Sequence, residues 1–220
     1  MTAGVFVTGS GTEVGKTYVA AGLIRALRRA GRPVRALKPV ASGFDPQHPE
    51  ESDAAALLGA LGGALGDGAG TIEEVSPWRF RAPLSPDMAA AREGRRIEFE
   101  ALLAFCRQPR AGLCLVEGVG GAMVPLDEGR TVLDWMEALG WPVIMVAGTY
   151  LGAISHALTA LDAVRRRGLP LLALVVNESE GGVDLDETAA TLARFAAAPV
   201  QVVPRGGDAA AFDRVAGLIP

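Results

Sequence analysis

Short apolar runs and longer amphipathic segments alternate along the chain. Uninterrupted apolar runs bounded by turn signals are typical of strands that are buried on both faces of a parallel sheet. Such runs predict strands at Leu113–Val116, Val143–Ala147 and Leu171–Val176, and shorter stretches predict strands at Val5–Thr8, Val34–Leu37 and Val200–Val203.

The segments between these strands carry apolar residues at helical spacing. In Lys16–Arg29 the apolar positions Val19, Leu23 and Leu27 recur every fourth residue, which predicts a helix. Comparable spacing predicts helices at Ser52–Leu61, Ile154–Arg167, Asp186–Ala196 and Ala209–Leu218.

The regular alternation of strand and helix indicates an α/β fold. We expect a mostly parallel central sheet with helices on both faces, which makes a three-layer sandwich. No internal repeat and no linker divides the sequence, so residues 1–220 are expected to form a single domain. The glycine-rich stretch 59–70 is predicted to be a connection, and Trp78 and Phe80 are predicted to lie in a loop that packs over the sheet.

Composition narrows the classes of protein that fit this pattern. Half of the 220 residues are hydrophobic and 21% are charged, which supports a sizeable core and excludes a disordered chain. The net charge of -4 argues against nucleic acid or an anionic membrane as the main partner. The sequence lacks a signal-peptide pattern and an apolar run of membrane-span length. We therefore expect a cytoplasmic protein, with Cys106 and Cys114 as reduced, buried thiols.

Lysine is rare in this sequence. The chain has 21 basic residues, of which only Lys16 and Lys38 are lysines and the other 19 are arginines. A compact ammonium is not replaced by a guanidinium fork without a change of geometry. The two lysines are therefore the first candidates for function.

A glycine-rich loop, GSGTEVGKT at residues 9–17, joins the first predicted strand to the first predicted helix. Glycines allow successive backbone N–H groups to face an anion, and the helix N-terminus adds its dipole. Lys16 supplies a charge for the outer phosphates of a nucleotide, and the Thr17 hydroxyl is a ligand for Mg²⁺. The loop encloses five residues between Gly9 and Gly15, whereas the general pattern encloses four, and Ser10 stands at the usual first-glycine position. The flanking strand and helix favour nucleotide binding over a turn with an exposed capping lysine.

Two acidic residues are candidate metal ligands, because Mg²⁺ on a phosphate loop usually needs carboxylates as well. Glu117 directly follows the strand Leu113–Val116 and precedes a GVGG segment, so its carboxylate is expected to face the site. Asp53 follows Ser52, a good N-cap, at a predicted helix start. For Asp53, metal binding and stabilisation of the helix dipole are equally supported.

Lys38 follows the strand Val34–Leu37 and begins the segment KPVASG. We expect this strand end to lie beside the first strand end, so that Lys38 is within reach of the terminal phosphate or of a second substrate. Pro39 restricts the direction in which the chain leaves the strand, and Ser42 offers a hydroxyl.

These segments occur together with other motifs, in the order FVTGSGTEVGKT, KPVASG, SD at 52–53, an SP-containing segment at 76–94, VEGVGG, LDW at 133–135, LGAISHA at 151–157 and Asn177. The combination resembles the ATP-dependent dethiobiotin synthetases of biotin biosynthesis, and it covers the chain to about Arg205. The extended loop ending in TEVGKT is characteristic of that family. The resemblance implies one P-loop NTPase-like domain over residues 1–220, and a homodimer.

The resemblance also implies a reaction, that of a ligase that forms C–N bonds. One amine of 7,8-diaminononanoate takes up CO2 as a carbamate. A carbamate oxygen attacks the γ-phosphate of ATP to give a mixed carbamic–phosphoric anhydride. The second amine then closes the cyclic urea and releases phosphate. Mg²⁺ is the implied cofactor and ATP the co-substrate.

The family's functional residues are carried over by matching position. The catalytic residues are Lys38, which would stabilise the carbamate, and Lys16, which would neutralise phosphate charge. Those implied to bind Mg²⁺ are Thr17, Asp53 and Glu117. Those implied to bind the nucleotide are Glu13, Val14, Gly15, Lys16, Thr17, Tyr18, Asp53, Glu117, Gly118, Val119, Gly120, Asn177, Pro204, Arg205 and Gly206. Those implied to bind the diamine substrate are Thr12, Lys38, Ser42, Gly152 and Ser155, the last two near the partner subunit.

Three other classes of nucleotide-binding protein were compared with this pattern. Dimeric ATPase switches carry an extra lysine early in the loop, where this chain has Ser10, Gly11 and Thr12, and are therefore excluded. A small-molecule kinase needs a lid bearing several arginines, for which Arg92, Arg95 and Arg96 are the candidates. A non-enzymatic nucleotide-binding module stays open, because motifs indicate capacity and not turnover.

Overall fold

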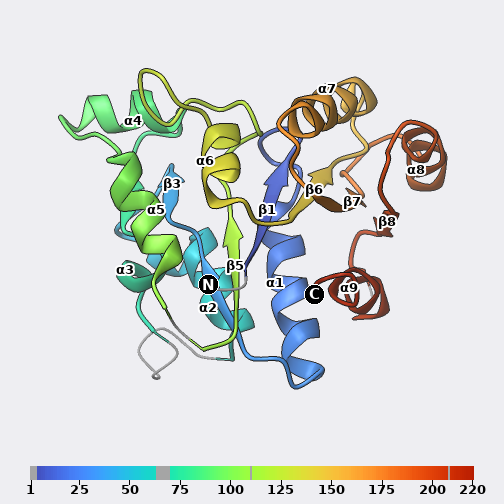
Figure 1. The fold of residues 1–220 in the computed structure, drawn as a ribbon, viewed down its shortest axis with the longest axis horizontal. Helices are drawn as coiled ribbons and strands as arrows, with labels where there is room; N and C mark the ends of the chain where they lie inside the picture. The colour runs from blue at the N-terminus through green and yellow to red at the C-terminus, as the bar shows by residue number, and fades with distance from the viewer. Residues whose placement is uncertain (1–3, 63–69, 110, 208) are drawn as a thin grey trace.

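A six-stranded parallel sheet forms the centre of the computed structural model, which describes residues 4–62, 70–109, 111–207 and 209–220 (Figure 1). The strand order is β2-β5-β1-β6-β7-β8, and every pair is parallel. The strands are β1 (Gly4–Gly9), β2 (Val34–Leu37), β5 (Leu113–Glu117), β6 (Val143–Ala147), β7 (Leu171–Asn177) and β8 (Val200–Val203). The predicted α/β fold with a mostly parallel sheet is confirmed.

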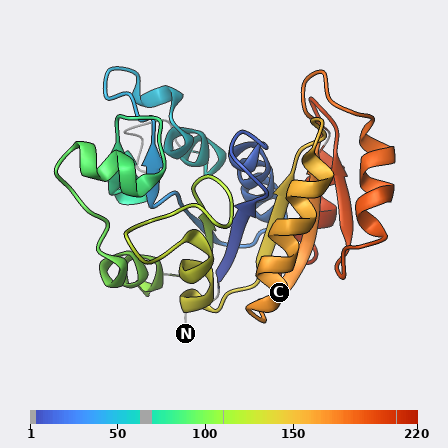
Figure 2. The same ribbon diagram turned by 90° about the horizontal axis from the view of Figure 1, so that it is seen from above.

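Helices cover both faces of this sheet (Figure 2). Alternate strand residues point to opposite faces, so Val5 and Val7 of β1 enter one apolar core while Phe6 enters the other. The first core is built with α1 (Lys16–Arg29), α2 (Asp53–Ala60), α3 (Ile72–Val75) and α9 (Ala209–Ala216). The second is built with α4 (Pro86–Arg92), α5 (Phe99–Arg107), α6 (Val132–Leu139), α7 (Ala153–Arg166) and α8 (Leu185–Ala193).

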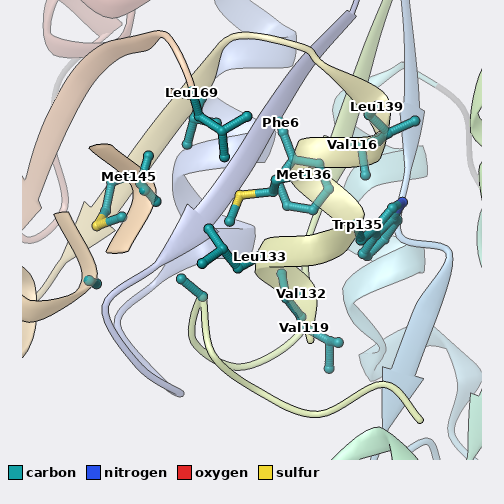
Figure 3. Close-up of a cluster of buried hydrophobic side chains, with 14 of the residues drawn as sticks. Phe6, Val116, Val119, Val132, Leu133, Trp135, Met136, Leu139, Met145 and Leu169 are labelled. Atoms are coloured by element: carbon teal, nitrogen blue, oxygen red, sulfur yellow. The ribbon is translucent and has the colours of Figure 1, made fainter. Parts of the chain in front are cut away.

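The second core is centred on α6, which lies over β1 and β5 (Figure 3). The ring of Trp135 meets Phe6 edge to face, with ring centroids 4.9 Å apart, the geometry that aromatic quadrupoles favour. Gly118 follows β5 beneath this pair, and a Cβ on Gly118 would lie 2.8 Å from the Phe6 ring. Close packing therefore fixes the path of the chain directly after Glu117.

One prediction about the sheet is wrong. The strand that leads to Lys38, β2, does not lie beside β1, because β5 is inserted between them. The carboxyl ends of β2, β5 and β1 are nevertheless consecutive along one edge of the sheet. Lys38, Glu117 and the glycine-rich loop therefore still meet.

A second difference concerns the segment after β2. Trp78 and Phe80 lie in a short strand, β4 (Trp78–Phe80), and not in a loop. This strand pairs in parallel with β3 (Val40–Ser42), and Trp78 packs edge to face on Phe105 of α5 at 5.8 Å. The pairing holds the chain after Lys38 in an extended path over the site.

Several short elements were not predicted. They are the strand β3, the helices α3, α4, α5 and α6, and a 3-10 turn, η1 (Pro49–Glu51). Residues 63–69 of the predicted connection 59–70 lie outside the described residues. Within the described residues no helix is long and apolar enough to cross a membrane. Cys106 and Cys114 are buried and form no disulfide among these residues, in agreement with the prediction.

Candidate active site

The glycine-rich loop at residues 9–15 leaves β1 and enters α1 in a strained conformation. Glu13 has φ 59°, a left-handed value that is uncommon for a residue with a side chain. Gly15 caps α1 with φ 86°, and a Cβ on it would lie 2.2 Å from the amide nitrogen of Asn177. Only glycine therefore fits at this position. At the start of α1, Lys16 turns back over the loop and its Nζ donates to the carbonyl of Gly11 at 2.9 Å.

Four other side chains meet beside this lysine. Lys38 Nζ lies 2.6 Å from Glu117 Oε1 and 2.9 Å from Asp53 Oδ2, and it also donates to the carbonyl of Gly118 at 2.9 Å. The Thr17 hydroxyl lies 2.8 Å from Asp53 Oδ1 and 2.7 Å from Glu117 Oε1. We call Lys16, Thr17, Lys38, Asp53 and Glu117 the lysine–carboxylate cluster.

The charges of this cluster are buried and depend on one another. Lys38 is 3% exposed and Glu117 is fully buried, whereas Asp53 keeps part of its carboxylate open to solvent. Burial opposes the charge on Lys38, but Glu117 and Asp53 more than offset it and raise the pKa of Lys38 above its usual value. Burial acts in the same sense on Asp53, yet Lys38 beside it lowers the pKa of that carboxyl. For Glu117, burial dominates and raises the pKa.

Lys16 differs from Lys38 in its pKa. Burial, and then the neighbouring charge of Lys38, lower the pKa of Lys16 to about 8, against partial compensation by Glu117 and Asp53. The described geometry pairs Lys16 with a neutral carbonyl and not with a carboxylate. An anionic ligand at the loop would supply the partner that this lysine lacks.

The cluster lines one cavity of about 770 Å³. Predicted site residues on its wall are Thr12, Glu13, Gly15, Lys16, Thr17, Lys38, Ser42, Asp53, Glu117, Val119 and Gly120. The Ser42 hydroxyl is buried and has no hydrogen-bond partner. Sequence reasoning missed the other lining residues, which are Ala41, Gly43, Pro83, Leu84, Ser85, Pro86 and Val124. The only sequence signal for the stretch 83–86 was the SP dipeptide at its end.

The oxygens of the cluster fit Mg²⁺ in combination with phosphate. Thr17, Asp53 and Glu117 present hard oxygen ligands around one point, and Glu117 Oε2 is buried without any partner. Among the described residues no group of three or more His, Cys, Asp or Glu side chains is placed to hold a metal. Mg²⁺ on nucleotides is typically bound by one or two carboxylates, with phosphate oxygens and water completing the octahedron. The donor set suits that arrangement and not an all-protein metal cage.

Other predicted nucleotide contacts lie on the far side of β1, at the ends of β7 and β8. The side-chain nitrogen of Asn177 donates to the carbonyl of Val14 at 3.1 Å. Arg205 is exposed, and its backbone N–H donates to Glu178 at 2.7 Å. We call Asn177 together with 204–206 the asparagine end. The segment 204–206 directly follows Val203 of β8, which pairs with Asn177 in the sheet.

The remaining predicted residues are more scattered. Tyr18 lies on α1, 40% exposed, with its ring against Phe212 of α9 at 5.6 Å. Val14 is a buried residue of the loop, and the carbonyl of Gly118 accepts a hydrogen bond from Lys38. Gly152 and Ser155 are exposed at the start of α7 and do not line the cavity. Within one chain the structure does not bring these last two residues to the cluster.

Two proteins that share one name are similar to this chain over most of its sequence. The chain is 50% identical over 212 residues to "ATP-dependent dethiobiotin synthetase BioD" of Methylobacterium nodulans, covering 92% of this chain and 93% of that protein. It is 56% identical over 178 residues to the protein of the same name from Acidiphilium cryptum, covering 80% and 79%. The chain belongs to the dethiobiotin synthetase family. A family model described as an AAA domain also matches residues 3–205 of this synthetase-family chain.

Solved structures support the fold alone. The MinC:MinD cell division protein complex of Aquifex aeolicus aligns with a TM-score of 0.52 and 13% identity, covering 97% of this chain and 86% of that chain. The signal recognition particle 54 kDa protein of Aeropyrum pernix, solved in complex with GDP, aligns with a TM-score of 0.51 and 20% identity, covering 99% and 46%. This member of the dethiobiotin synthetase family thus shares its fold with these two solved proteins.

Proposed function

We propose that this chain is a dethiobiotin synthetase, which carboxylates 7,8-diaminononanoate with CO2 and closes the cyclic urea at the expense of ATP. The observation that carries the proposal is the lysine–carboxylate cluster, which places Lys38 and Lys16 on the wall of one cavity. Membership of the synthetase family supports the same substrate and product. The proposal includes a cytoplasmic homodimer with residues 1–220 as one domain.

Lys38 is proposed to act on the carbamate. Addition of CO2 to an amine generates an anion and releases a proton, and a buried ammonium stabilises such an anion strongly because little water screens it. Ser42 lies on the same cavity wall with a free hydroxyl, and we propose that it hydrogen-bonds the diamine together with Thr12. Pro83 and Leu84 line the same space and suit the apolar carbon chain of the substrate.

Lys16 is proposed to hold the outer phosphates of ATP while a carbamate oxygen attacks the γ-phosphorus and ADP leaves. Phosphoryl transfer depends mainly on positioning and on neutralisation of charge. Thr17, Asp53 and Glu117 would hold Mg²⁺, which would neutralise part of the negative charge of the phosphates. The backbone of 13–18 and 117–120 would complete the phosphate site. The second amine then attacks the carbonyl carbon of the mixed anhydride, and phosphate leaves.

The asparagine end is proposed to bind the adenine. Asn177 offers a carboxamide next to Gly15, and the exposed residues 204–206 follow Val203, which pairs with Asn177 in the sheet. Gly152 and Ser155 are proposed to contact the substrate's carboxylate tail in the partner subunit, since a helix N-terminus suits an anion. Their exposure and the 92% exposure of Leu151 next to them are in keeping with an interface there.

A direct assay tests the proposal. Purified protein is incubated with diaminononanoate, bicarbonate, Mg²⁺ and ATP, and phosphate release is followed together with dethiobiotin by mass spectrometry. We expect phosphate release to depend on the diamine and to match dethiobiotin in amount. The matched controls omit the diamine or use Arg166→Met, which alters an exposed ion pair far from the cavity. Absence of diamine-dependent phosphate release from a folded preparation contradicts the proposal.

A small-molecule kinase is less well supported. Its lid would require arginines over the phosphates, but Arg95 stacks on Phe80 and pairs with Glu93, and Arg96 pairs with Glu98. Neither side chain lines the cavity of the lysine–carboxylate cluster. These arginines are occupied elsewhere in the fold. If the purified protein forms no phosphorylated diamine and no phosphorylated dethiobiotin in the same assay, a small-molecule kinase activity is excluded for these substrates.

A further inference from the structure

The ammonium of Lys38 uses all of its hydrogen-bonding capacity within the protein. An ammonium carries three donors and no acceptor. Its neighbours at Lys38 are Glu117 Oε1 at 2.6 Å, Asp53 Oδ2 at 2.9 Å and the carbonyl of Gly118 at 2.9 Å. In this arrangement no N–H of Lys38 is left to bind a carbamate. The side chain must give up contacts before it can act on a substrate.

Two of those three contacts are the carboxylates that fit Mg²⁺. Glu117 Oε1 already accepts from Lys38 and also lies 2.7 Å from the Thr17 hydroxyl. A Mg²⁺ ion bound at about 2.0–2.1 Å to such an oxygen would stand within a few ångströms of the ammonium. Two cations that close in a site so little screened by water repel each other strongly. The ammonium and the metal therefore make use of the same negative charge.

We propose that Lys38 and the divalent metal compete for Asp53 and Glu117, so that metal binding displaces the Lys38 ammonium from these carboxylates into the cavity. The cavity gives the displaced ammonium space to move into, because Lys38 itself lies on the cavity wall. In its substrate part, the inference rests on the proposed function: the lysine that stabilises the carbamate becomes available only after the metal is bound. Carboxylation is thereby coupled to loading of metal and nucleotide.

The variant Lys38→Met distinguishes two roles of Lys38, competition with the metal for the carboxylates and support of the carboxylates for the metal. If Lys38 competes, Lys38→Met removes a cation from the metal site and metal binds more tightly. If Lys38 instead holds the two carboxylates in place for the metal, the same variant binds metal more weakly. The measured quantity is the dissociation constant for Mn²⁺, followed by its electron paramagnetic resonance signal at pH 8, with ADP and without it, and with no diamine present.

We expect Lys38→Met to tighten Mn²⁺ binding by about tenfold, a conservative fraction of the repulsion between two close charges. The matched control is Arg166→Met, which removes one positive charge from an exposed pair with Asp162 and is expected to leave Mn²⁺ affinity unchanged. Weaker or unchanged Mn²⁺ binding in Lys38→Met overturns the competition. Because no diamine is used, this result stands or falls separately from dethiobiotin synthetase activity.

A second measurement on the wild-type protein covers the case in which Lys38→Met does not fold. The chain has only two lysines, so ¹⁵N-lysine labelling produces two side-chain ammonium resonances, and Lys16→Arg assigns them. A buried, fully hydrogen-bonded ammonium exchanges slowly with water and gives an observable signal. We expect saturation with Mg²⁺ and ADP to shift the Lys38 resonance or to broaden it through faster exchange. A Lys38 resonance that is the same with and without Mg²⁺ overturns the proposal.

Discussion

Lys38 and Asn177 both lie at carboxyl ends of strands of the same sheet, on opposite sides of β1, but their surroundings differ. Lys38 is buried against two carboxylates, Asp53 and Glu117, and forms an ion pair with each of them. Asn177 makes one hydrogen bond to the loop, and the neighbouring 204–206 is exposed.

This difference separates residues that support the fold from residues whose proposed role is limited to contacting the nucleotide. A buried charge that loses its partner costs far more than an exposed group that loses a contact. Substitutions in the lysine–carboxylate cluster should therefore change stability and turnover together. Substitutions at the asparagine end should change nucleotide affinity while the fold stays intact.

The largest effect is expected for Glu117→Ala, which leaves Lys38 buried with half of its compensating charge. We expect the free energy of unfolding to fall by about 3–5 kcal/mol and turnover to be lost. Urea denaturation followed by circular dichroism measures the change. Asp162→Ala is the control, because Asp162 pairs with Arg166 on the exposed surface and its loss should change stability little. If the two variants lose the same amount of free energy of unfolding, the greater dependence of the fold on the buried cluster is contradicted.

The next largest effect is expected when the ammonium group at position 38 is replaced by a cation of different geometry. In Lys38→Arg the charge is kept, but a planar guanidinium cannot reproduce three contacts that converge on one nitrogen. We expect turnover to drop by about a hundredfold or more, with a smaller loss of stability than in Glu117→Ala. Steady-state phosphate release measures it, with Arg166→Lys as the control. Near-normal turnover would remove Lys38 from the mechanism.

A pH dependence is expected from Lys16, whose pKa is about 8. Phosphate binds the charged ammonium, which is present below pH 8 and is lost as the pH rises through that value. Affinity for ATP should therefore fall by about tenfold between pH 8 and pH 9.5, and binding at pH 8.5 should take up protons, which calorimetry in two buffers detects.

Lys16→Arg sharpens this test, because a guanidinium stays charged throughout that range. The variant is expected to bind ATP with little dependence on pH above 8. A pH profile identical to that of the wild type would assign the titration to another group.

The smallest effect is expected at the asparagine end. Asn177→Ala removes the hydrogen bond to Val14 and a proposed adenine contact, so we expect ATP affinity to weaken by about fivefold, equivalent to about 1 kcal/mol. The unfolding midpoint should stay close to that of the wild type. Fluorescence titration with a labelled ATP analogue measures the change. A large loss of stability would show that Asn177 belongs with the buried cluster.

The reasons why parts of the site escaped prediction are physical. An uninterrupted apolar run is enough to predict that a strand is buried on both faces. Which strands lie beside it in the sheet depends on how distant segments pack. For this reason Val34–Leu37 was correctly predicted as a strand and wrongly placed beside β1. The stretch 83–86 reaches the cavity only because β4 pairs with β3, and no local periodicity indicates that pairing.

The short helices were missed for a related reason. The capping box of Thr71 and Glu74 starts a helix of four residues, too short to show an apolar period. Asp53 shows that a residue can be recognised as a candidate from the sequence while its role stays open. Its position at a helix start is equally consistent with stabilisation of the helix dipole and with metal binding. The structure alone shows that its carboxylate lies 2.9 Å from Lys38 Nζ and 2.8 Å from the Thr17 hydroxyl.

The sequence by itself determined the local features of this protein: the buried strands, the glycine-rich loop with Lys16, and the isolation of Lys38 among arginines. Backbone preferences and apolar periods act over a few residues, so they can be recognised without knowledge of the fold. The tertiary structure alone decided that β5 separates β2 from β1 and brings Glu117 between the two lysines. That outcome depends on which distant surfaces pack together, and the same packing buries the charges deeply enough for each to require its partner.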